Sequence, residues 1–365
     1  MRGKNDQQQA MMFVVSLEEM IPASHPIRAV KKLADAELAS LNGVFSRMYS
    51  TTGRPSIPPE CLLKAGLLMA FYSIRSERQL CEQLHYNFLF RWFLDMGVND
   101  AVFDPSTFSQ NRERILKEDV ARQFFDGIVN AARGEGLLSS EHFTVDGTLI
   151  EACASLKSFK PKNARSDKGD DNKKPPQSRN EEVNYHGQKR SNATHVSTTD
   201  PQARLARKSD GKGAKLSFAA QVLMENRNGL CVDISVAQAT GTVEVEQSLE
   251  LIRRQKGRGV PIKTVGGDKL YDQKPFVSEV RKERIVPHVA AKNSCSALDQ
   301  RTTRHKTYEI SQRIRKRIEE IFGWMKTTGG FGRTRYRGVQ RTGLSAYIVA
   351  SAYNLLRISK LLKGA

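Results

Sequence analysis

The sequence predicts a chain of two parts, an all-α segment followed by an α/β domain. Two observations carry this prediction. The first 135 residues read as short helices separated by prolines and glycines, whereas strand-like alternation of apolar and polar residues begins at about Glu141. Beyond that point strands and amphipathic helices follow one another, which is typical of an α/β domain. We therefore expect a helical N-terminal domain over residues 1–135 and a second domain over residues 136–365.

The first segment carries recognisable helix signals. Residues 61–74 (CLLKAGLLMAFYSI) are apolar almost all round, which indicates a helix packed inside a bundle. Ser76 and Gln79 form a capping-box pattern, and Asp104 followed by Pro105 is typical of a helix start. We expect the helix after Pro105 to expose polar and basic residues at its end, namely Gln110, Asn111, Arg112 and Arg114. This pattern leaves open a helix-turn-helix module and a plain helical bundle.

The elements of the second domain follow in an order that specifies a fold. Residues 142–152 (HFTVDGTLIEA) alternate as a strand does, and two further strand-like runs are joined by the hairpin signal at residues 227–229 (RNG). An amphipathic helix, a short apolar strand with a Gly-Gly turn, a helix and a strand come next. A longer helix over Tyr308–Lys326 and a final apolar helix complete the order. It is the order of a ribonuclease-H-like α/β domain.

The charge balance points to a polyanionic partner. The 365-residue chain has 58 Lys and Arg against 39 Asp and Glu, a formal net charge of +19, and its pI is near 9.8. Such a surplus is typical of nucleic-acid binding. Five scattered cysteines without a C-x-x-C pair argue against a disulfide framework and a cysteine zinc site. No apolar run is long enough for a signal-peptide core or a membrane span, so we expect a cytoplasmic, nucleoid-associated protein without membrane contact.

A basic insertion separates the first two strands of the second domain, over residues 155–215. Between Phe159 and Val196 it has almost no aliphatic residues, so this stretch cannot bury enough surface to offset the entropy of ordering. We therefore expect the insertion to be flexible. Two roles are open: it could clamp DNA, or it could be a tolerated linker.

Two aspartates lie where such a domain places ligand sites. Asp146 lies within the first strand in an apolar setting, and Asp268 directly follows the Gly-Gly strand. Ligands of open α/β sheets bind at the carboxyl edge of the strands. Hard Mg²⁺ prefers oxygen ligands, and two ions can stabilise both the attacking and the leaving oxygen of a phosphoryl transfer. Either aspartate alone could be a turn former or a helix cap, but the pair favours a metal site.

Helix geometry selects a third carboxylate. At about 100° per residue, one stripe of the helix over Tyr308–Lys326 is apolar and must face the core. Its members are Ile310, Ile314, Ile318, Ile321 and Met325. Glu319 lies at the margin of this stripe and is the candidate metal ligand. Glu320 points to the far side, where we expect ion pairs with its helix neighbours Arg313, Lys316 and Arg317. A surface helix of mixed charge is the alternative for both glutamates.

Cations surround Glu319. From Arg301 to Arg337 the chain has 11 basic and 3 acidic residues. Arg315 precedes Glu319 by one turn and Lys326 follows it by two, and three arginines come after the next Gly-Gly pair, namely Arg333, Arg335 and Arg337. A phosphate backbone is the natural counter-charge, and such contacts make binding strongly dependent on salt. Trp324, on the same helix, could stack on an unpaired base or belong to the core.

These residues resemble a known family. Residues 313–326 (RIRKRIEEIFGWMK) fit most of the signature Y-x-x-R-x-x-x-E-x-x-x-x-x-x-K of DDE transposases from bacterial insertion sequences, with Arg315, Glu319 and Lys326 in register. TVDGTLIEA resembles the first-aspartate segment of the family and GGDKLYD resembles its second. IPASHPIRAV with GRPSIPPECLLKAGLLMAFYSIRSERQLCEQL resembles a helical domain that precedes the catalytic domain in one large subgroup. The similarity covers nearly the whole chain, from about Ile21 to Ser351.

The sequence departs from the family pattern at two places. Gln312 stands at the signature tyrosine, where it can still donate and accept hydrogen bonds. Gly267 and Leu270 replace the usual residues beside Asp268. Tyr271 and Asp272 could hold Asp268 in position without contacting the ligand themselves, although the residue preferences of a turn explain them equally well.

The resemblance implies a ribonuclease-H-like fold in which Asp146, Asp268 and Glu319 bind two Mg²⁺ ions, with Mn²⁺ as a substitute. It also implies a transposase that cleaves the terminal inverted repeats of its element and joins the 3′-hydroxyl ends to target DNA. The partner would be double-stranded DNA, bound by a homodimer or a higher assembly with help from the N-terminal domain. Two alternatives stay open: a structure-specific nuclease of the same fold, and a catalytically silent DNA-binding protein derived from a transposase.

Overall fold

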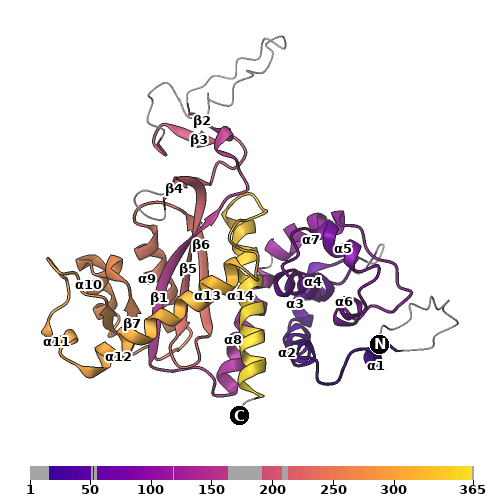
Figure 1. Cartoon of the computed structure of the whole chain (residues 1–365), viewed down its shortest axis with the longest axis horizontal. Helices are drawn as coiled ribbons and strands as arrows, with labels where there is room; N and C mark the ends of the chain where they lie inside the picture. Colours follow the sequence, from indigo (N-terminus) through magenta and orange to yellow (C-terminus); the bar gives the residue numbers. More distant parts are fainter. Residues whose placement is uncertain are drawn as a thin grey trace, which may run out of the picture.

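The computed structural model of the chain describes residues 16–50, 52, 56–117, 119–162, 191–207 and 213–363. In this part of the chain, helices alone precede the first strand, and strands and helices mix after it (Figure 1). The described helices before the sheet are α1 (Leu17–Met20), α2 (Ile27–Ser40), α3 (Asn42–Met48), α4 (Pro59–Phe71), α5 (Glu77–Gln83), α6 (Phe88–Phe93), α7 (Ser106–Lys117) and α8 (Val120–Gly134).

Local signals in the sequence account for several of these helices. α4 is buried on nearly every side, as its unbroken apolar run requires. At the start of α5, Ser76 Oγ accepts a hydrogen bond from the backbone N–H of Gln79 at 3.1 Å. Gln79 Oε1 in turn accepts one from the N–H of Arg75 at 3.1 Å, not from that of Ser76. The Ser76 half of the expected capping box therefore forms, and the reciprocal bond lies one residue earlier.

A mixed sheet forms the centre of the second part. Its strands are β1 (His142–Glu151), β4 (Arg204–Ala206), β5 (Lys215–Glu225), β6 (Cys231–Gln238), β7 (Thr264–Gly267) and β8 (Val286–Val289). β5 pairs antiparallel with β1 and β6, and β7 pairs parallel with β1 and β8. The order across the sheet is therefore β6-β5-β1-β7-β8, and β4 extends the β6 side beside the first residues of β5. This mixed sheet, with the first strand in the middle, confirms the expected ribonuclease-H-like arrangement.

The long helix expected before the last one is broken. The helices of this part are α9 (Val243–Gly257), α10 (Lys274–Lys282), α11 (Gln300–Thr303), α12 (Lys306–Ile314), α13 (Ile318–Lys326) and α14 (Val339–Leu361). A 3₁₀ turn, η4 (Arg315–Arg317), separates α12 from α13. Its three residues per turn rotate the apolar stripe of α13 away from that of α12. The expected core position of Ile310 is therefore wrong: its side chain is 45% exposed, whereas Ile318, Ile321 and Met325 are buried.

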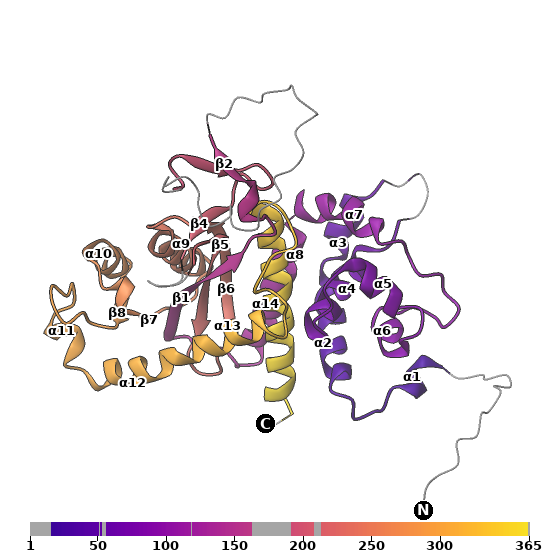
Figure 2. The same cartoon turned by 45° about the horizontal axis from the view of Figure 1, so that its top comes forward.

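Two adjacent glycines of β7 show which elements cover which side of the sheet. A Cβ on Gly266 would lie 3.2 Å from Thr144 Oγ1 and 3.7 Å from the Cβ of Arg315. A Cβ on Gly267 would lie 2.9 Å from the ring of Tyr271. Because successive residues of a strand point to opposite faces, η4 and α13 cover one face and Tyr271 lies on the other, where α9 packs on β5. Figure 2 shows α12 and α13 running along the sheet towards α14.

α14 joins the two parts of the molecule. It packs against β6 on one side and against α2, α4 and α8 on the others, and it stands between the sheet and the N-terminal helices in Figure 1. Its buried Asn354 accepts a hydrogen bond from the N–H of Cys231 at 3.0 Å and donates one to the carbonyl of Cys231 at 2.7 Å. One hydrophobic cluster runs from α2 and α4 through α14 into β1, β5 and β6. None of the described helices combines the length and apolarity needed to cross a membrane.

Part of the insertion that we expected to be flexible is folded. Residues 155–162 and 191–207 form the 3₁₀ turn η1 (Leu156–Ser158), a small ladder of β2 (Phe159–Pro161) with β3 (His195–Ser197), and the edge strand β4. Phe159 and Ala203 of these residues pack with Leu216 and Phe218 of β5 in a separate hydrophobic cluster. Residues 163–190 and 208–212 lie outside the described residues.

Candidate active site

The register of β1 and β7 brings two aspartates together. Thr144 pairs with Gly266 across the two parallel strands, and Asp146 and Asp268 each lie two residues further along. Residues two apart in a strand share a face, and neighbouring strands lie about 4.8 Å apart. The carboxylates therefore lie side by side at the carboxyl end of β7. Asp268 also caps the 3₁₀ turn η3 (Lys269–Tyr271), because its Oδ1 accepts a hydrogen bond from the N–H of Leu270 at 2.8 Å.

The surroundings of Asp146 disfavour its charged form. Burial raises its pKa to about 7, and the nearby carboxylates of Asp268 and Glu244 contribute to the rise. A hydrogen bond from the N–H of Gly147 to Asp146 Oδ1, 2.8 Å long, and the guanidinium of Arg315 lower the pKa but do not cancel the effect. This is the electrostatic environment expected of a cation site, since a bound cation offsets the repulsion between neighbouring half-buried carboxylates.

Sequence reasoning missed Glu244. This residue lies in the first turn of α9, and its pKa is raised by burial first and by Asp268 second. Acidic residues in a first helical turn are common because they complement the helix dipole. Nothing in the sequence therefore separated Glu244 from Glu246, its neighbour in the same turn.

The two glutamates of α13 point to different sides. Glu320 forms an ion pair with Arg357 of α14, with Nη1 and Oε2 3.2 Å apart. The expected pairing of Glu320 with its helix neighbours is thus wrong, and Arg317 donates instead to the carbonyl of Arg227 at 2.8 Å. Glu319 is exposed, and no hydrogen bond or ion pair joins it to another described residue. It remains available to a ligand.

Both cations expected around Glu319 reach towards the aspartates. Lys326 Nζ donates to Thr148 Oγ1, and Thr148 shares a face of β1 with Asp146. Glu319 precedes Lys326 by two helical turns and therefore projects from the same side of α13. Arg315 is close enough to Asp146 to lower the pKa of its carboxyl.

Gln312 connects Arg315 to the sheet. Gln312 Oε1 accepts a hydrogen bond from Arg315 Nε at 3.0 Å, and Gln312 Nε2 donates to the carbonyl of His288 in β8 at 2.5 Å. The amide at the signature tyrosine position thus uses both its donor and its acceptor. It holds the guanidinium of Arg315 over the face of the sheet that carries Asp146.

The candidate ligand atoms are of the type that binds divalent cations, although the three carboxylates do not lie close together. The candidate ligands are carboxylate oxygens, the type that Mg²⁺ and Mn²⁺ prefer. Among the residues that the structure describes, no three His, Cys, Asp or Glu side chains are close enough together to hold a metal ion. Asp146 and Asp268 form a pair, whereas Glu319 stays apart from it.

Tyr271 supports the aspartate pair from the α9 side of the sheet. Its fully buried hydroxyl donates to Gln221 Oε1 at 3.3 Å and accepts from Ser248 Oγ at 3.2 Å. Gln221 lies opposite Gly147 in the ladder of β1 and β5, and a Cβ on Gly147 would lie 2.4 Å from Gln221 Nε2. Gly147, which follows Asp146, and Gly267, which precedes Asp268, therefore both pack against one buried polar network.

The arginines after α13 have different surroundings. Arg333 donates to the carbonyls of Ala152 at 3.4 Å and Cys153 at 3.3 Å. Arg335 Nη2 donates to the carbonyl of Ile74 at 2.7 Å, so this side chain bridges to the N-terminal helices. Arg337 is exposed.

Trp324 lies in a packed position. It is half-buried, and its ring lies 5.7 Å from that of Tyr353, edge to face. This arrangement favours the core interpretation of Trp324 over base stacking.

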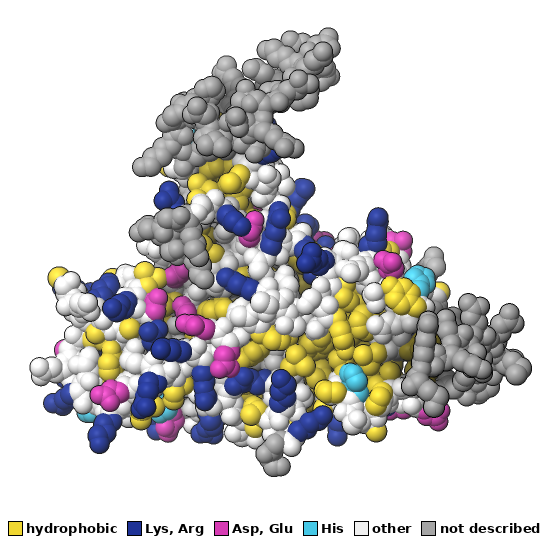
Figure 3. Space-filling view, in the orientation of Figure 1, with side chains coloured by type: hydrophobic (Ala, Val, Ile, Leu, Met, Phe, Trp, Pro, Cys, Tyr) yellow, Lys and Arg dark blue, Asp and Glu magenta, His cyan; other side chains and the backbone are white. Residues whose placement is uncertain are grey.

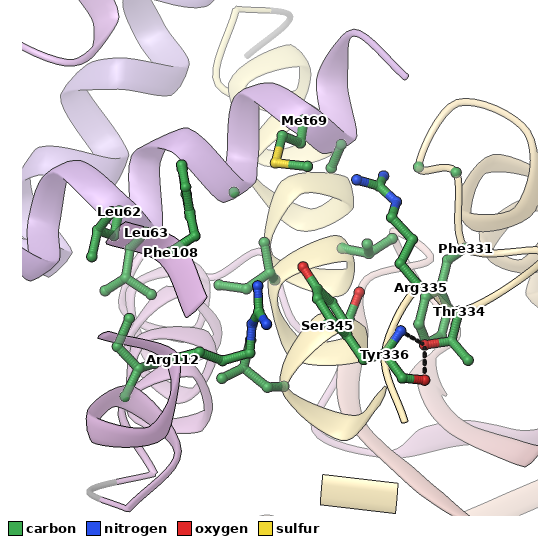
Figure 4. Close-up of a pocket in the computed structure, with 18 of the residues that line it drawn as sticks. Leu62, Leu63, Met69, Phe108, Arg112, Phe331, Thr334, Arg335, Tyr336 and Ser345 are labelled. Carbon is green, nitrogen blue, oxygen red and sulfur yellow. Dashed lines mark hydrogen bonds between the residues drawn. The ribbon is translucent and has the colours of Figure 1, made fainter. Parts of the chain in front are cut away.

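A pocket of about 90 Å³ lies away from the aspartates, between α4, α7, α14 and the loop after α13 (Figure 4). At its side, Arg112 stacks over the ring of Tyr336 at 4.3 Å, and Glu77 Oε1 accepts from Arg112 at 2.7 Å and from the Tyr336 hydroxyl at 3.0 Å. Arg112 and the buried Asn111 are therefore not the exposed residues that the helix pattern predicted. The pocket belongs to the contact between the N-terminal helices and the rest of the chain.

Comparisons with known proteins identify two transposase domains in the chain. Residues 138–355 match the family model described as "Transposase DDE domain", and residues 15–114 match a second one, "Transposase domain (DUF772)". Among solved structures, the chain is similar to a piggyBac transposase synaptic complex with hairpin DNA, with 8% identity, a TM-score of 0.40, and coverage of 93% of this chain and 76% of that chain. It is also similar to a Mos1 transposase paired-end complex, with 11% identity, a TM-score of 0.21, and coverage of 85% and 81%.

Proposed function

Because the chain belongs to the Transposase DDE domain family, whose model matches residues 138–355, we propose that Asp146, Asp268 and Glu319 hold two divalent cations for DNA cleavage and strand transfer. The family is one of metal-dependent enzymes that cut DNA and transfer its strands. The observation that carries our assignment is the register that sets Asp146 beside Asp268 on the face crossed by α13. Mg²⁺ is the expected ion and Mn²⁺ its substitute.

Glu319 completes the set when DNA and cations are bound. It projects from the side of α13 that carries Lys326, and Lys326 already contacts β1. The 3₁₀ turn η4 precedes α13, and such turns within a helical stretch often act as hinges. A small shift of α13 about η4, together with rotation of the exposed Glu319 side chain, would bring the carboxylate towards the aspartate pair. Neutralisation of the three negative charges by cations would favour this closed state.

The chain's own residues position the DNA phosphates. When bound, the two ions supply Lewis-acid stabilisation of the charge on the attacking and leaving oxygens. Arg315, fixed by Gln312, and Lys326, fixed on Thr148, bind non-bridging phosphate oxygens on either side of Glu319. Water attacks the phosphodiester at the element end and frees a 3′-hydroxyl. That hydroxyl then attacks a phosphodiester of the target strand by the same in-line displacement.

Assembly on DNA follows from the reaction. Two element ends must be joined to one target, so we expect a homodimer or a higher assembly on double-stranded DNA that carries terminal inverted repeats. The helical segment before β1 would contribute to DNA binding or to assembly. The strongly basic composition of the chain agrees with this partner.

An assay with the ends of the element tests the function. Purified protein and Mg²⁺ should cleave a duplex that ends in the inverted repeat and should join the freed 3′ end to a plasmid, and EDTA should stop both steps. Products are resolved on denaturing gels. Cleavage governed by DNA structure and without joining would support a nuclease, and binding without cleavage would support a silent DNA-binding protein.

Replacing Glu244 by Gln should weaken the use of Mg²⁺ without abolishing cleavage. Its charge reaches both aspartates, and removing it lowers the negative potential that attracts the cations. We expect the Mg²⁺ concentration for half-maximal cleavage to rise about 3- to 10-fold, which corresponds to about 1 kcal/mol of lost attraction. Glu246→Gln, an exposed neighbour in the same turn, is the matched control. An unchanged Mg²⁺ titration in Glu244→Gln would show that this carboxylate does not influence the site.

A further inference from the structure

The folded ends of the insertion form a stem, defined as residues 155–162 and 191–207. β2 and β3 pair within it, with Phe159 opposite Ser197 and Pro161 opposite His195. The ring of Phe159 is buried and stacks on that of His195 at 5.4 Å. The stem is therefore a folded projection, and Figure 1 shows it beyond the end of the sheet.

The stem is also fixed to the rest of the chain. The buried Asp200 accepts a hydrogen bond from the N–H of Gly338 at 3.1 Å, and Gln202 Oε1 accepts one from the N–H of Val339 at 2.8 Å. These two acceptors cap the first turn of α14. A side chain on the stem therefore has a defined position relative to the sheet.

The exposed charge of the stem is entirely positive. Its described residues include one acid, Asp200, which is 1% exposed and serves as the cap. They also include the five bases Lys157, Lys160, Lys162, Arg204 and Arg207. Because side chains alternate along a strand, Lys160 and Lys162 lie on the face opposite the buried Phe159. Both lysines are exposed, and the ladder continues to Lys162, whose N–H donates to the carbonyl of Thr194 at 3.0 Å.

This positive surface continues into the loop after α13. Arg333 donates to the carbonyls of Ala152 and Cys153, at the foot of the stem. Burial raises the pKa of the Cys153 thiol, and the positive charges of Arg337 and Arg333 both lower it. Arg337 therefore also lies near the foot of the stem. Figure 3 shows Lys and Arg side chains gathered around the base of the projection.

We propose that the stem, together with Arg333 and Arg337, binds the phosphate backbone of the DNA duplex beside the reacting phosphate. This inference rests on the proposed function of Asp146. β1 leads from Asp146 to Glu151, a span of about 17 Å at 3.3 Å per residue. In this proposal the duplex runs along β1, and because it has one base pair per 3.4 Å, it passes the foot of the stem about 5 base pairs from Asp146. Lysines bind phosphates as point charges, and the stem therefore contributes affinity without reading sequence.

Removing the two outer lysines tests this surface. The double variant Lys160→Ala/Lys162→Ala is compared with Lys274→Ala/Lys282→Ala, which removes two exposed lysines of α10. Fluorescence anisotropy measures Kd for a 40-base-pair end duplex in EDTA at several NaCl concentrations. The stem variant should bind more weakly, and the slope of log Kd against log salt should fall by about 1 to 2, since each phosphate contact contributes about 0.9. The α10 variant should keep the slope of the unmodified chain.

Two further measurements complete the test. On a duplex that extends only about 4 base pairs from the reacting phosphate, the stem variant and the unmodified chain should have equal affinity, because this DNA does not reach the stem. Thermal melting checks that both variants are folded. Equal salt slopes for the stem variant and the unmodified chain overturn the proposal, and so does an equal loss on short and long duplexes. Because binding is measured in EDTA, the outcome does not depend on whether the carboxylates cleave DNA.

Discussion

We expect cleavage of DNA that carries the element ends to be abolished by Asp146→Asn, Asp268→Asn or Glu319→Gln. Glu320→Gln should retain it. Each of the first three changes removes one charged ligand and leaves the side-chain volume almost unchanged. A loss of about 4 kcal/mol or more of transition-state stabilisation corresponds to a rate at least about 1,000-fold lower. Single-turnover cleavage in Mg²⁺ measures the loss, and anisotropy in EDTA should show nearly unchanged DNA binding.

Glu320→Gln is a matched control because it makes the same substitution at the next residue of the same helix. Glu320 pairs with Arg357, away from the aspartates. We expect the Asp146→Asn variant to fold, because burial raises the pKa of Asp146 and the neutral amide removes a charge that the folded chain disfavours. Normal cleavage by Glu319→Gln would contradict the assignment of the third ligand. Equal losses in Glu319→Gln and Glu320→Gln would indicate damage to α13 instead.

Gly147→Ala is expected to disable the site through packing. The new methyl group would lie 2.4 Å from Nε2 and 2.6 Å from Oε1 of Gln221. Gln221 is fully buried, and its Oε1 accepts a hydrogen bond from the Tyr271 hydroxyl, so moving its amide aside would break that bond. Its Nε2 already has no partner among the described residues. We expect a loss of about 2 to 4 kcal/mol in the free energy of unfolding, measured by urea denaturation, and a large loss of cleavage because Asp146 is the preceding residue.

A second substitution separates the clash from other effects of alanine. In Gly147→Ala/Gln221→Ala the space of the amide becomes free for the methyl group, and the hydroxyl of Tyr271 keeps its bond with Ser248. The double variant should recover a substantial part of the lost stability, whereas independent effects would add. If the stability lost in the double variant equals the sum of the losses in the two single variants, the clash with Gln221 is not the reason that Gly147 is required.

The order of the strands was predictable from the sequence because each strand has a local signal. Alternation marks β1, the RNG turn marks the hairpin of β5 and β6, and the Gly-Gly pair marks the end of β7. The positions of Asp146 and Asp268 within these strands follow from the same signals. Their closeness does not, because it depends on the pairing of Thr144 with Gly266, which no local pattern records.

The parts that the sequence could not predict depend on contacts between distant segments. The 3₁₀ turn η4 interrupts a stretch without proline, and its own residues are Arg and Lys, which have good helix propensity, so periodicity predicted one helix and a false core position for Ile310. Glu320 and Arg357 are 37 positions apart, and helix spacing could not reveal their pairing. Glu244 approaches the aspartates because α9 packs across β5, β6 and β1, which helix spacing alone does not reveal.

The position of α14 affects how the chain can fold during synthesis. Every element that α14 contacts is translated before it, including α2, which is the second described helix. A nascent chain that has not reached Val339 has made the sheet and the N-terminal helices but lacks the apolar helix that both of them bury. Such a chain exposes hydrophobic surface, which makes it a target for chaperones and proteases. Interrupted translation should therefore yield products that are degraded, and few DNA-binding fragments would compete with the finished protein.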